Sequence, residues 1–193
     1  MTTKPDRDEL LMMQVVKGDQ AAIEPLVRRY ASPLLTYIHR VIGDHHCGEE
    51  LFQEVFVTVW VKRHTYQFPR PFKPWLYTIA INKCRAWLRK NRNVRRPQFM
   101  NESVTDGVAV AVAPDASPVQ TLVGTEKASI VKAAVDGLAI KQREVVVLRV
   151  WNGLPYAEIS QMLGRSESTV RVQMHQALAV MRHKLDPCLR EDD

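Results

Sequence analysis

Apolar residues recur every three to four positions along most of this chain, which is the spacing typical of one-sided helices. In the first half, this spacing predicts helices at residues 10–16, 21–42 and 75–96, with another around Phe52 and Phe56. Residues 75–96 contain neither glycine nor proline, so we expect one long helix there. The first half is therefore predicted to be entirely helical.

Prolines modify this pattern at three places. Pro25 fits only the first turn of a helix, because proline has no backbone N–H to donate, so the second helix should begin near Glu24 or bend there. Pro33, further along the same predicted helix, also lacks the N–H that a helix interior needs. Three prolines within residues 66–74 fix φ and remove backbone donors, which predicts a stiff, extended loop before the long helix.

Residues 101–124 differ in composition from the segments on either side. They contain Gly107, Pro114 and Pro118 together with small residues, and they show no helical stripe. We interpret this stretch as a linker. Its apolar run at residues 108–113 leaves a short strand open as an alternative.

Helical spacing returns beyond the linker, and it predicts four more helices at residues 125–135, 141–151, 156–163 and 166–185. The last two have the pattern of a helix-turn-helix. Ser160 is small where the helices must approach, Gly164 supplies the positive φ of the turn, and Ser166 caps the second helix. An ordinary helical hairpin is the alternative. The outward positions of the second helix, which would meet base edges in a major groove, are Glu167, Ser168, Arg171, Val172, His175 and Gln176.

Charge adds a class of partner to this picture. The 193 residues carry 27 Lys and Arg against 21 Asp and Glu, which gives a formal net charge of +6 and a pI near 9.4. A basic protein favours a polyanionic partner. Residues 62–96 hold eleven of the cations and no carboxylate, whereas residues 44–56 hold four carboxylates and no Lys or Arg. An acidic surface followed by a basic one indicates two different partners.

Aromatic residues concentrate around the same basic stretch. Arg and Lys neutralise phosphates and exposed rings stack on unpaired bases, so this combination is typical of single-stranded nucleic-acid binding. Core packing of the rings and a solvated helix face for the charges are the alternatives. The rings on or beside the proline-rich loop, which we expect to be exposed, are Tyr66, Phe68, Phe72 and Trp75.

Other classes of function find little support in the sequence. Three scattered cysteines give neither a disulfide framework nor a zinc site, and His45-His46-Cys47 lacks a second pair of ligands. No apolar run reaches the ~18 residues of a membrane span, and no signal core follows the N-terminus. There is no phosphate-binding loop and no nucleophilic triad. We therefore expect no catalytic residue, no metal, no cofactor and no membrane insertion.

Three short segments and their order point to a known family. ELFQEVF at residues 50–56 and PWLYTIAIN at residues 74–82 precede the basic helix and the linker, and GLPYAEI at residues 153–159 leads into the helix-turn-helix. In this order they resemble the sigma-70 family of bacterial RNA polymerase subunits, and the layout is similar to its extracytoplasmic-function (ECF) subfamily. The likeness covers about residues 8–96 and 128–187.

The resemblance implies an all-α fold of two small helical domains joined by a flexible linker, the C-terminal one a helix-turn-helix. It implies sigma region 2 at residues 1–97, a linker at 98–127, sigma region 4 at 128–187 and a tail at 188–193. The protein would be no enzyme but a promoter-specific initiation subunit that binds core RNA polymerase and promoter DNA. It would be cytoplasmic, would lie on the nucleoid within the holoenzyme, and could have an anti-sigma factor as a further partner.

The resemblance also assigns roles to residues of the first half. Residues that would dock on the clamp helices of the largest polymerase subunit are Glu50, Leu51, Gln53, Glu54 and Phe56. Asn82 would read a flipped base of the −10 element, because a base outside the stack offers its pairing edge to an amide. The other residues expected to hold single-stranded −10 DNA are Lys62, Arg63, Tyr66, Phe68, Arg70, Phe72, Lys73, Trp75, Lys83, Arg85, Arg89 and Lys90.

In the second half, the resemblance implies that the helix-turn-helix reads the −35 element as duplex DNA. Arg149 would contact a phosphate. The remaining residues of this expected site are Ser166, Glu167, Ser168, Arg171, Val172, His175 and Gln176.

Two other classes of function remain as alternatives. A conventional helix-turn-helix regulator, with an N-terminal module for dimerisation or ligand binding, would leave the basic loop and its rings unexplained. A nucleic-acid-modifying enzyme would need a carboxylate or a metal site in the basic stretch, and residues 62–96 contain no Asp or Glu.

Overall fold

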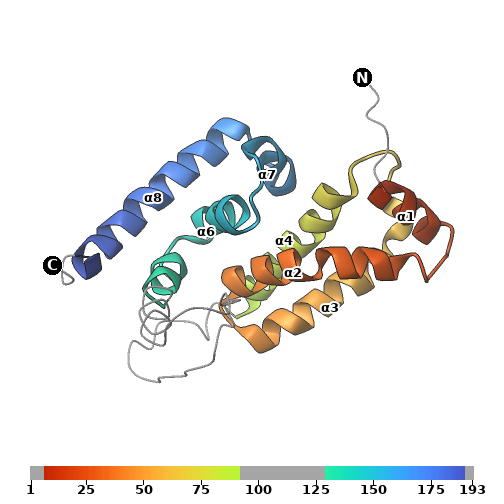
Figure 1. Ribbon diagram of the computed structural model, residues 1–193, viewed down its shortest axis with the longest axis horizontal. Coiled ribbons are helices and arrows are strands. Elements are labelled where there is room, and N and C mark those ends of the chain that lie inside the picture. The colour runs from red at the N-terminus through yellow and green to blue at the C-terminus, as the bar shows by residue number, and fades with distance from the viewer. Residues whose placement is uncertain (1–6, 92–128, 190–193) are drawn as a thin grey trace, which may run out of the picture.

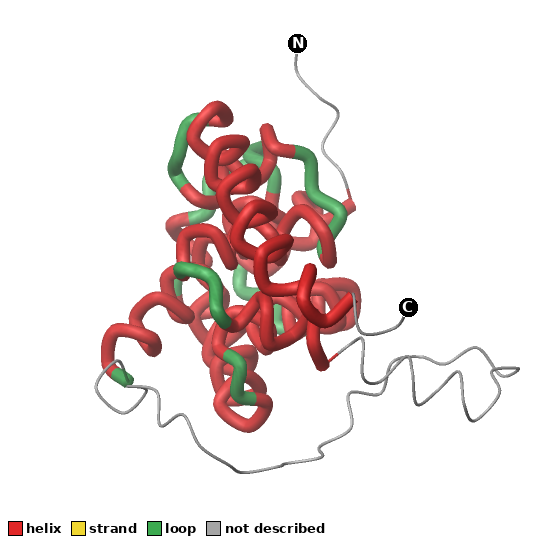
Figure 2. The backbone as a smooth tube through the Cα atoms, turned by 90° about the vertical axis from the view of Figure 1, so that its left-hand side faces the viewer, coloured by secondary structure: helices red, strands yellow, loops and turns green. Residues whose placement is uncertain are grey.

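Helices make up the regular structure of the computed structural model, which describes residues 7–91 and 129–189 (Figures 1 and 2). The all-α prediction is confirmed for these ranges; the linker and its possible strand at residues 108–113 lie outside them. None of the described helices combines the length and the apolar character needed to cross a bilayer. In the first half the elements are α1 (Arg7–Val16), α2 (Ile23–Ile42), α3 (His45–Val61), the 3₁₀ turn η1 (Arg63–Thr65) and α4 (Phe72–Lys90). In the second half they are a helix at 129–136, α6 (Ile140–Val146), the π-helical turn η2 (Val147–Trp151), α7 (Tyr156–Leu163) and α8 (Glu167–Leu189).

Local signals account for the ends of α2 and α3. Pro25 is the third residue of α2, where a missing N–H costs nothing, as its position in the sequence indicated. Pro33 lies inside the helix. The helix ends at Gly43, whose φ of 72° lets its N–H return to the carbonyl of His39. Asp44 then caps α3 by accepting a hydrogen bond from the N–H of Cys47 at 3.0 Å.

The basic helix α4 begins at Phe72, three residues earlier than the expected start at residue 75. The extended loop is correspondingly shorter, and Pro74 lies in the first turn of the helix. The prediction of a loop through residue 74 was therefore wrong at its end. The cause is a contact across the chain: the backbone N–H of Phe72 donates to Oε1 of Glu9 at 2.9 Å, so a carboxylate of α1 caps α4.

The second half follows its predicted boundaries closely, with one irregularity. The helix expected at residues 141–151 changes from α6 into the wide turn η2, where the N–H of Asn152 reaches the carbonyl of Val147, five residues back, at 3.2 Å. The helix α7 has the predicted bounds. The final helix, α8, continues four residues beyond the expected end at residue 185.

The two halves of the described chain share one apolar core. In Figure 1, α6 lies between the long α8 and the bundle formed by α1–α4. Contacts join α7 to α4 and join both α6 and η2 to α2. Fully buried side chains on the two sides include Tyr37 and Tyr77 from the first half and Leu148 and Ile159 from the second. The two helical domains that the sequence indicated are therefore packed against each other in the described part of the chain.

Two buried carboxylates of α1 hold the first half together. Asp8 accepts hydrogen bonds from the hydroxyl of Tyr30, at 2.7 Å, and from the guanidinium of Arg29, both on α2. Glu9, the next residue, caps α4 as described above. Burial and the hydrogen bond to Asp8 raise the pKa of Tyr30 well above its usual range. Through these hydrogen bonds the short α1 is tied to both α2 and the start of α4.

Replacing Glu9 should therefore lower the free energy of unfolding more than replacing an exposed glutamate such as Glu24. In Glu9→Ala, the buried N–H of Phe72 loses its acceptor, and we expect the free energy of unfolding to fall by about 1–2 kcal/mol in urea titrations. Glu24→Ala, which removes an exposed ion pair with Arg28 within α2, should change it by less than about 0.5 kcal/mol. Equal effects of the two substitutions would contradict the capping role of Glu9.

Candidate nucleic-acid interface

A hollow of about 260 Å³ lies between the proline-rich loop and the first turns of α4. Residues of the loop and of α4 line it, and Gln161 of α7 contributes from the second half of the chain. The residues that matter most for its chemistry are Tyr66, Gln67, Arg70, Trp75, Thr78 and, from α7, Gln161. The hollow thus combines an indole, a phenol and polar groups.

The rings of the proline-rich loop and of the first turn of α4 are less exposed than the sequence indicated. Phe68 is 44% exposed, and Trp75 is half-buried. The expectation of exposure was wrong for Phe72, which is fully buried because α4 begins there and turns the ring into the core against Tyr30. It was also wrong for Tyr66, which is 6% exposed.

Tyr66 lines the hollow and is held in place by its neighbours. Its hydroxyl donates to the backbone carbonyl of Arg70, and its ring meets the edge of Trp75 with centroids 5.4 Å apart. Burial raises the pKa of the Tyr66 phenol above its usual range, so the hydroxyl keeps its proton. This hydrogen bond fixes the conformation of the loop. The accessible rings are Phe68 of the loop and Trp75 of α4.

Asn82 is exposed on α4. It lies one helical turn after Thr78, which lines the hollow, and residues four apart share one face of a helix. The amide of Asn82 and the ring-lined hollow are therefore on the same side of α4. An amide and an accessible ring on one side of a helix are groups that can hydrogen-bond to and stack on an unstacked base.

Several cations expected at this surface are already paired with carboxylates from other helices. Lys83 contacts Glu54 of α3 at 2.7 Å, and Lys73 contacts Glu158 of α7 at 3.1 Å. Arg85 forms two hydrogen bonds to the carboxylate of Glu144 on α6. The cations of this site that are exposed in the structure are Lys62, Arg70, Arg89 and Lys90.

Arg63 is held within its own segment. Its guanidinium donates to the carbonyl of Trp60 at 2.8 Å and lies 4.4 Å from the centre of the Trp60 ring. This contact fixes the chain at the end of α3, where the loop begins. Arg63 is only partly exposed, and its contacts with Trp60 orient its guanidinium.

The acidic helix α3 presents a different set of residues from the expected one. Glu50, Gln53 and Glu54 are exposed, whereas Leu51 and Phe56 lie in the core. This burial leaves Leu51 and Phe56 little surface for direct contact with a partner. Helical spacing places them on the inner face, since Leu51, Val55 and Val59 recur every four residues and are all buried.

Two valines that the sequence analysis did not single out lie on the outer face of α3. Val57 is 62% exposed and Val61 is 66% exposed. They continue, at helical spacing, the exposed line that begins with Glu50, Gln53 and Glu54. That spacing is visible in the sequence and could have identified them. The result is an apolar pair with a polar border on one side, which is typical of a protein-binding surface.

The helix-turn-helix has the predicted local geometry. Gly164 adopts φ of 64° and donates its N–H to the carbonyl of Ser160. Ser166 caps α8 by accepting a hydrogen bond from the N–H of Thr169 at 3.2 Å, and Val170 is fully buried against the preceding helices. The expected outward residues that the structure leaves exposed on α8 are Ser168, Arg171, Val172, His175 and Gln176.

Two arginines of the helix-turn-helix half, Arg149 and Arg171, lie over the ring of Tyr156. Arg149 lies 4.9 Å and Arg171 4.6 Å from the centre of the Tyr156 ring. Arg149 also donates to the carbonyl of Leu154 at 3.0 Å, and Glu167, which is half-buried, binds Arg171 one turn away. The guanidinium groups are therefore oriented in advance on the exposed side of the helix-turn-helix.

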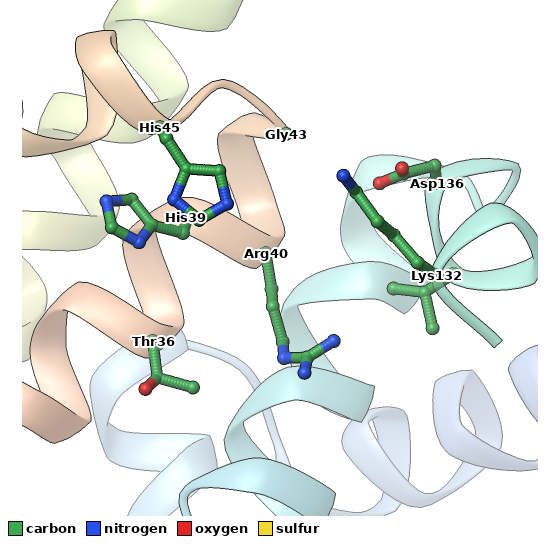
Figure 3. Close-up of a pocket in the computed structure, with 8 residues that line it drawn as sticks. Thr36, His39, Arg40, Gly43, His45, Lys132 and Asp136 are labelled. Atoms are coloured by element: carbon green, nitrogen blue, oxygen red, sulfur yellow. The ribbon is translucent and has the colours of Figure 1, made fainter. Parts of the chain in front are cut away.

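A second pocket lies where α2 and α3 meet the helix at 129–136 (Figure 3). The rings of His39 and His45 lie against each other with centroids 4.4 Å apart. Burial lowers the pKa of His39, and Arg40 stacks on Trp151 at 4.0 Å. Within residues 7–91 and 129–189, no three His, Cys, Asp or Glu side chains come together as candidate metal ligands.

Comparison with known proteins identifies the family. The model of Sigma-70 region 2 matches residues 26–94, and that of Sigma-70, region 4 matches residues 129–181. The chain is 30% identical to the ECF RNA polymerase sigma factor SigX of Bacillus subtilis (strain 168), over 84% of this chain and 82% of SigX. The chain belongs to the ECF subfamily of the sigma-70 family. This sigma factor is also 28% identical to SigW of the same organism, over 89% of the chain and 93% of SigW.

Solved structures show the same fold. The structure of CnrH in complex with the cytosolic domain of CnrY superposes with a TM-score of 0.71 at 24% identity, over 94% of this chain and 99% of that one. The sigma factor RpoE of Bartonella quintana, solved with the anti-sigma factor NepR, gives a TM-score of 0.65 at 20% identity, over 85% of this chain and 96% of that one. The helical fold of this chain is thus shared by both of these solved structures.

The turn of the helix-turn-helix offers a direct test of its backbone. A Cβ at Gly164 would meet no atom within 4 Å, so the cost of a side chain there is the positive φ alone. We expect Gly164→Ala to lower the free energy of unfolding by about 1–2 kcal/mol, and Gly164→Asn to cost less because asparagine adopts this conformation more readily. Equal losses for the two variants in urea titrations would contradict this explanation.

Proposed function

We propose that this sigma factor directs initiation at specific promoters through three surfaces. The outer face of α3 docks on core RNA polymerase, the α4 surface captures single-stranded −10 DNA, and the helix-turn-helix reads −35 duplex DNA. The proposal assigns region 2 to residues 1–97 and region 4 to residues 128–187, with the linker at 98–127. The observation that carries it is the exposed Asn82 beside a hollow lined by aromatic rings.

The −10 surface has the two kinds of group that a flipped base needs. An unstacked base offers its face to a ring, here Trp75 or Phe68, and its pairing edge to an amide, here Asn82. Exposed cations at both ends of the surface, such as Arg70 and Arg89, suit the phosphates of a strand that crosses it. Lys62 and Lys90 extend the same charge.

Asn82 provides the sharpest test of this role. With the polymerase core and a promoter of this factor, Asn82→Ala should reduce strand opening at least about tenfold, because a base would lose its hydrogen-bonding partner. Binding to the core enzyme should not change. Opening is measured by permanganate reactivity of unpaired thymines.

Asn91→Ala is the matched control on the same helix. Asn91 lies at the end of α4, and its side-chain amide donates to the carbonyl of Trp87 at 3.1 Å. This variant loses an asparagine outside the proposed base site, so strand opening should remain near the wild-type level. Strand opening by Asn82→Ala at the wild-type level would remove Asn82 from the −10 site.

The outer face of α3 suits a protein partner. Val57 and Val61 are exposed apolar residues, and Glu50, Gln53 and Glu54 give the surface its polar part. An apolar centre with polar neighbours is the usual composition of a protein interface. We assign this surface to the clamp helices of the largest polymerase subunit.

Val57→Glu tests the docking surface. A charge at this position should weaken binding to core polymerase at least about tenfold, since burying it in an interface leaves it without a partner. Because Val57 is exposed in the free protein, the free energy of unfolding should change by less than about 0.5 kcal/mol. Leu10→Glu, at an exposed position of α1, is the control and should leave core binding unchanged. Core binding is measured by fluorescence anisotropy. Equal binding by Val57→Glu and Leu10→Glu would contradict the assignment.

The helix-turn-helix surface supports duplex readout. Ser168, Val172 and Gln176 project from the exposed face of α8, where they can meet base edges in a major groove. Arg149 and Arg171, held over Tyr156, are placed for phosphates. RpoE of Bartonella quintana was solved with the anti-sigma factor NepR, and we extend this to the proposal that an anti-sigma factor binds this chain as well.

A further inference from the structure

The short helix α1 (Arg7–Val16) precedes residue 26, where the match to Sigma-70 region 2 begins. It nevertheless packs against the elements that form the proposed −10 surface. The helix contacts α2, the turn η1 and α4. Two of these, η1 and α4, flank the proline-rich loop and its hollow. A helix outside the family match is therefore in a position to influence the surface assigned to −10 DNA.

Glu9 makes the most specific of these contacts. The residue is 7% exposed, and its Oε1 accepts a hydrogen bond from the backbone N–H of Phe72 at 2.9 Å. The other carboxylate oxygen, Oε2, is buried and has no hydrogen-bond partner among the described residues. Burying an unpaired carboxylate oxygen is costly, so stability alone does not account for a glutamate at this position.

The first turn of α4 has no cap of its own. Pro71, the residue before the helix, makes no side-chain capping hydrogen bond, and the first turn contains no Asp or Glu. Glu9 supplies from α1 both the acceptor and the negative charge that the N-terminus of a helix favours. The place of Phe72, the first residue of α4, is thus fixed by a different helix.

Phe72 packs directly against two rings that line the hollow. Its ring centroid lies 6.2 Å from that of Tyr66 and 6.1 Å from that of Trp75, and the latter two are 5.4 Å apart. The three rings form a closed triangle in a tightly packed region, so a movement of Phe72 also moves its neighbours. Trp75 is the member of this triangle that stays accessible, and the proposed function stacks it on an unpaired base.

We propose that Glu9 is a positioning residue for single-stranded −10 DNA, which fixes the orientation of the Trp75 ring by capping α4 at Phe72. This inference rests on the proposed function for the role of Trp75. Glu9 acts through Phe72 and does not touch the strand itself, since its side chain is buried. Because the cap is one hydrogen bond to Oε1, a side chain of equal length that keeps the accepting oxygen should preserve the function.

Fluorine NMR of the full chain labelled with 5-fluorotryptophan reports on the Trp75 ring directly. The chain has four tryptophans, and the Trp75 resonance is identified by its loss in Trp75→Phe. Glu9→Ala should shift or broaden this resonance, because the start of α4 loses its cap. Glu9→Gln, whose amide oxygen can accept the same hydrogen bond, should leave it near the wild-type position. An unchanged Trp75 resonance in Glu9→Ala would overturn the proposal.

Asp44→Ala is the matched control, because it removes the same kind of contact from another helix. Asp44 caps α3 at the end remote from the proline-rich loop, where it accepts a hydrogen bond from the N–H of Cys47 at 3.0 Å. Loss of either cap should lower the free energy of unfolding by a similar amount. Asp44→Ala should leave the Trp75 resonance unchanged. If it altered the resonance as much as Glu9→Ala does, general loosening would explain the effect and the positioning role would be wrong.

Promoter opening by the holoenzyme tests the consequence for DNA. With the polymerase core and a promoter of this factor, Glu9→Ala should reduce the permanganate reactivity of unpaired thymines about fivefold, since a displaced ring loses part of its stacking on a base. Core binding should not change in the Glu9 variants. Glu9→Gln and Asp44→Ala should open the promoter nearly as well as wild type. Equal opening by Glu9→Ala and Asp44→Ala, or an equal loss in Glu9→Gln, would overturn the positioning role.

Trp75→Ala separates failure of this inference from failure of the proposed function. Normal opening by Trp75→Ala would show that the proposed stacking role of the ring is wrong. Reduced opening by Trp75→Ala together with normal opening by Glu9→Ala would show that the ring acts on DNA but that Glu9 does not position it. We expect reduced opening in both variants and recovery in Glu9→Gln.

Discussion

The arrangement of this protein depends on how one buried carboxylate is satisfied. Glu144 lies in a region otherwise built from Val145–Leu148 and other apolar residues, so its charge is tolerated only with Arg85 and Arg165 in place. Hydrogen bonding to Glu144 raises the pKa of Arg85, which keeps the arginine charged. Removing either arginine would leave an uncompensated buried charge, so this carboxylate favours the arrangement that keeps both in place. Here that arrangement is the packing of α6 and α7 on α2 and α4.

Sequence reasoning succeeded where a signal and its structural effect are close together in the chain. Gly164 and Ser166 act within a few residues, and the bounds of α7 and the turn before α8 follow from them. Pro25 likewise marks the first turn of α2. The helical class of the described residues and the order of the helices came from apolar spacing, which is also a local property.

Sequence reasoning failed where the deciding partner is far away in the chain. The start of α4 depends on Glu9, sixty-three residues earlier, and this start turns Phe72 into the core. The absence of carboxylates in residues 62–96 indicated unpaired cations, yet Glu54, Glu144 and Glu158 reach this segment from other helices. A window along the sequence cannot show such pairs, because folding decides which segments become neighbours. The exposure of Asn82 and of Val57 depended only on helical phase.

Carboxylates and phosphates present the same chemistry to a guanidinium, and this equivalence links the fold to the proposed function. Arg85 binds the two oxygens of Glu144 with the fork geometry that it would offer to a phosphate of DNA. An arginine that suits a phosphate therefore also accepts a well-placed carboxylate of its own chain, and the intramolecular contact has the advantage of a high effective concentration. On the proposed function, the cations of α4 that stay exposed, such as Arg89 and Lys90, are the ones left to contact phosphates.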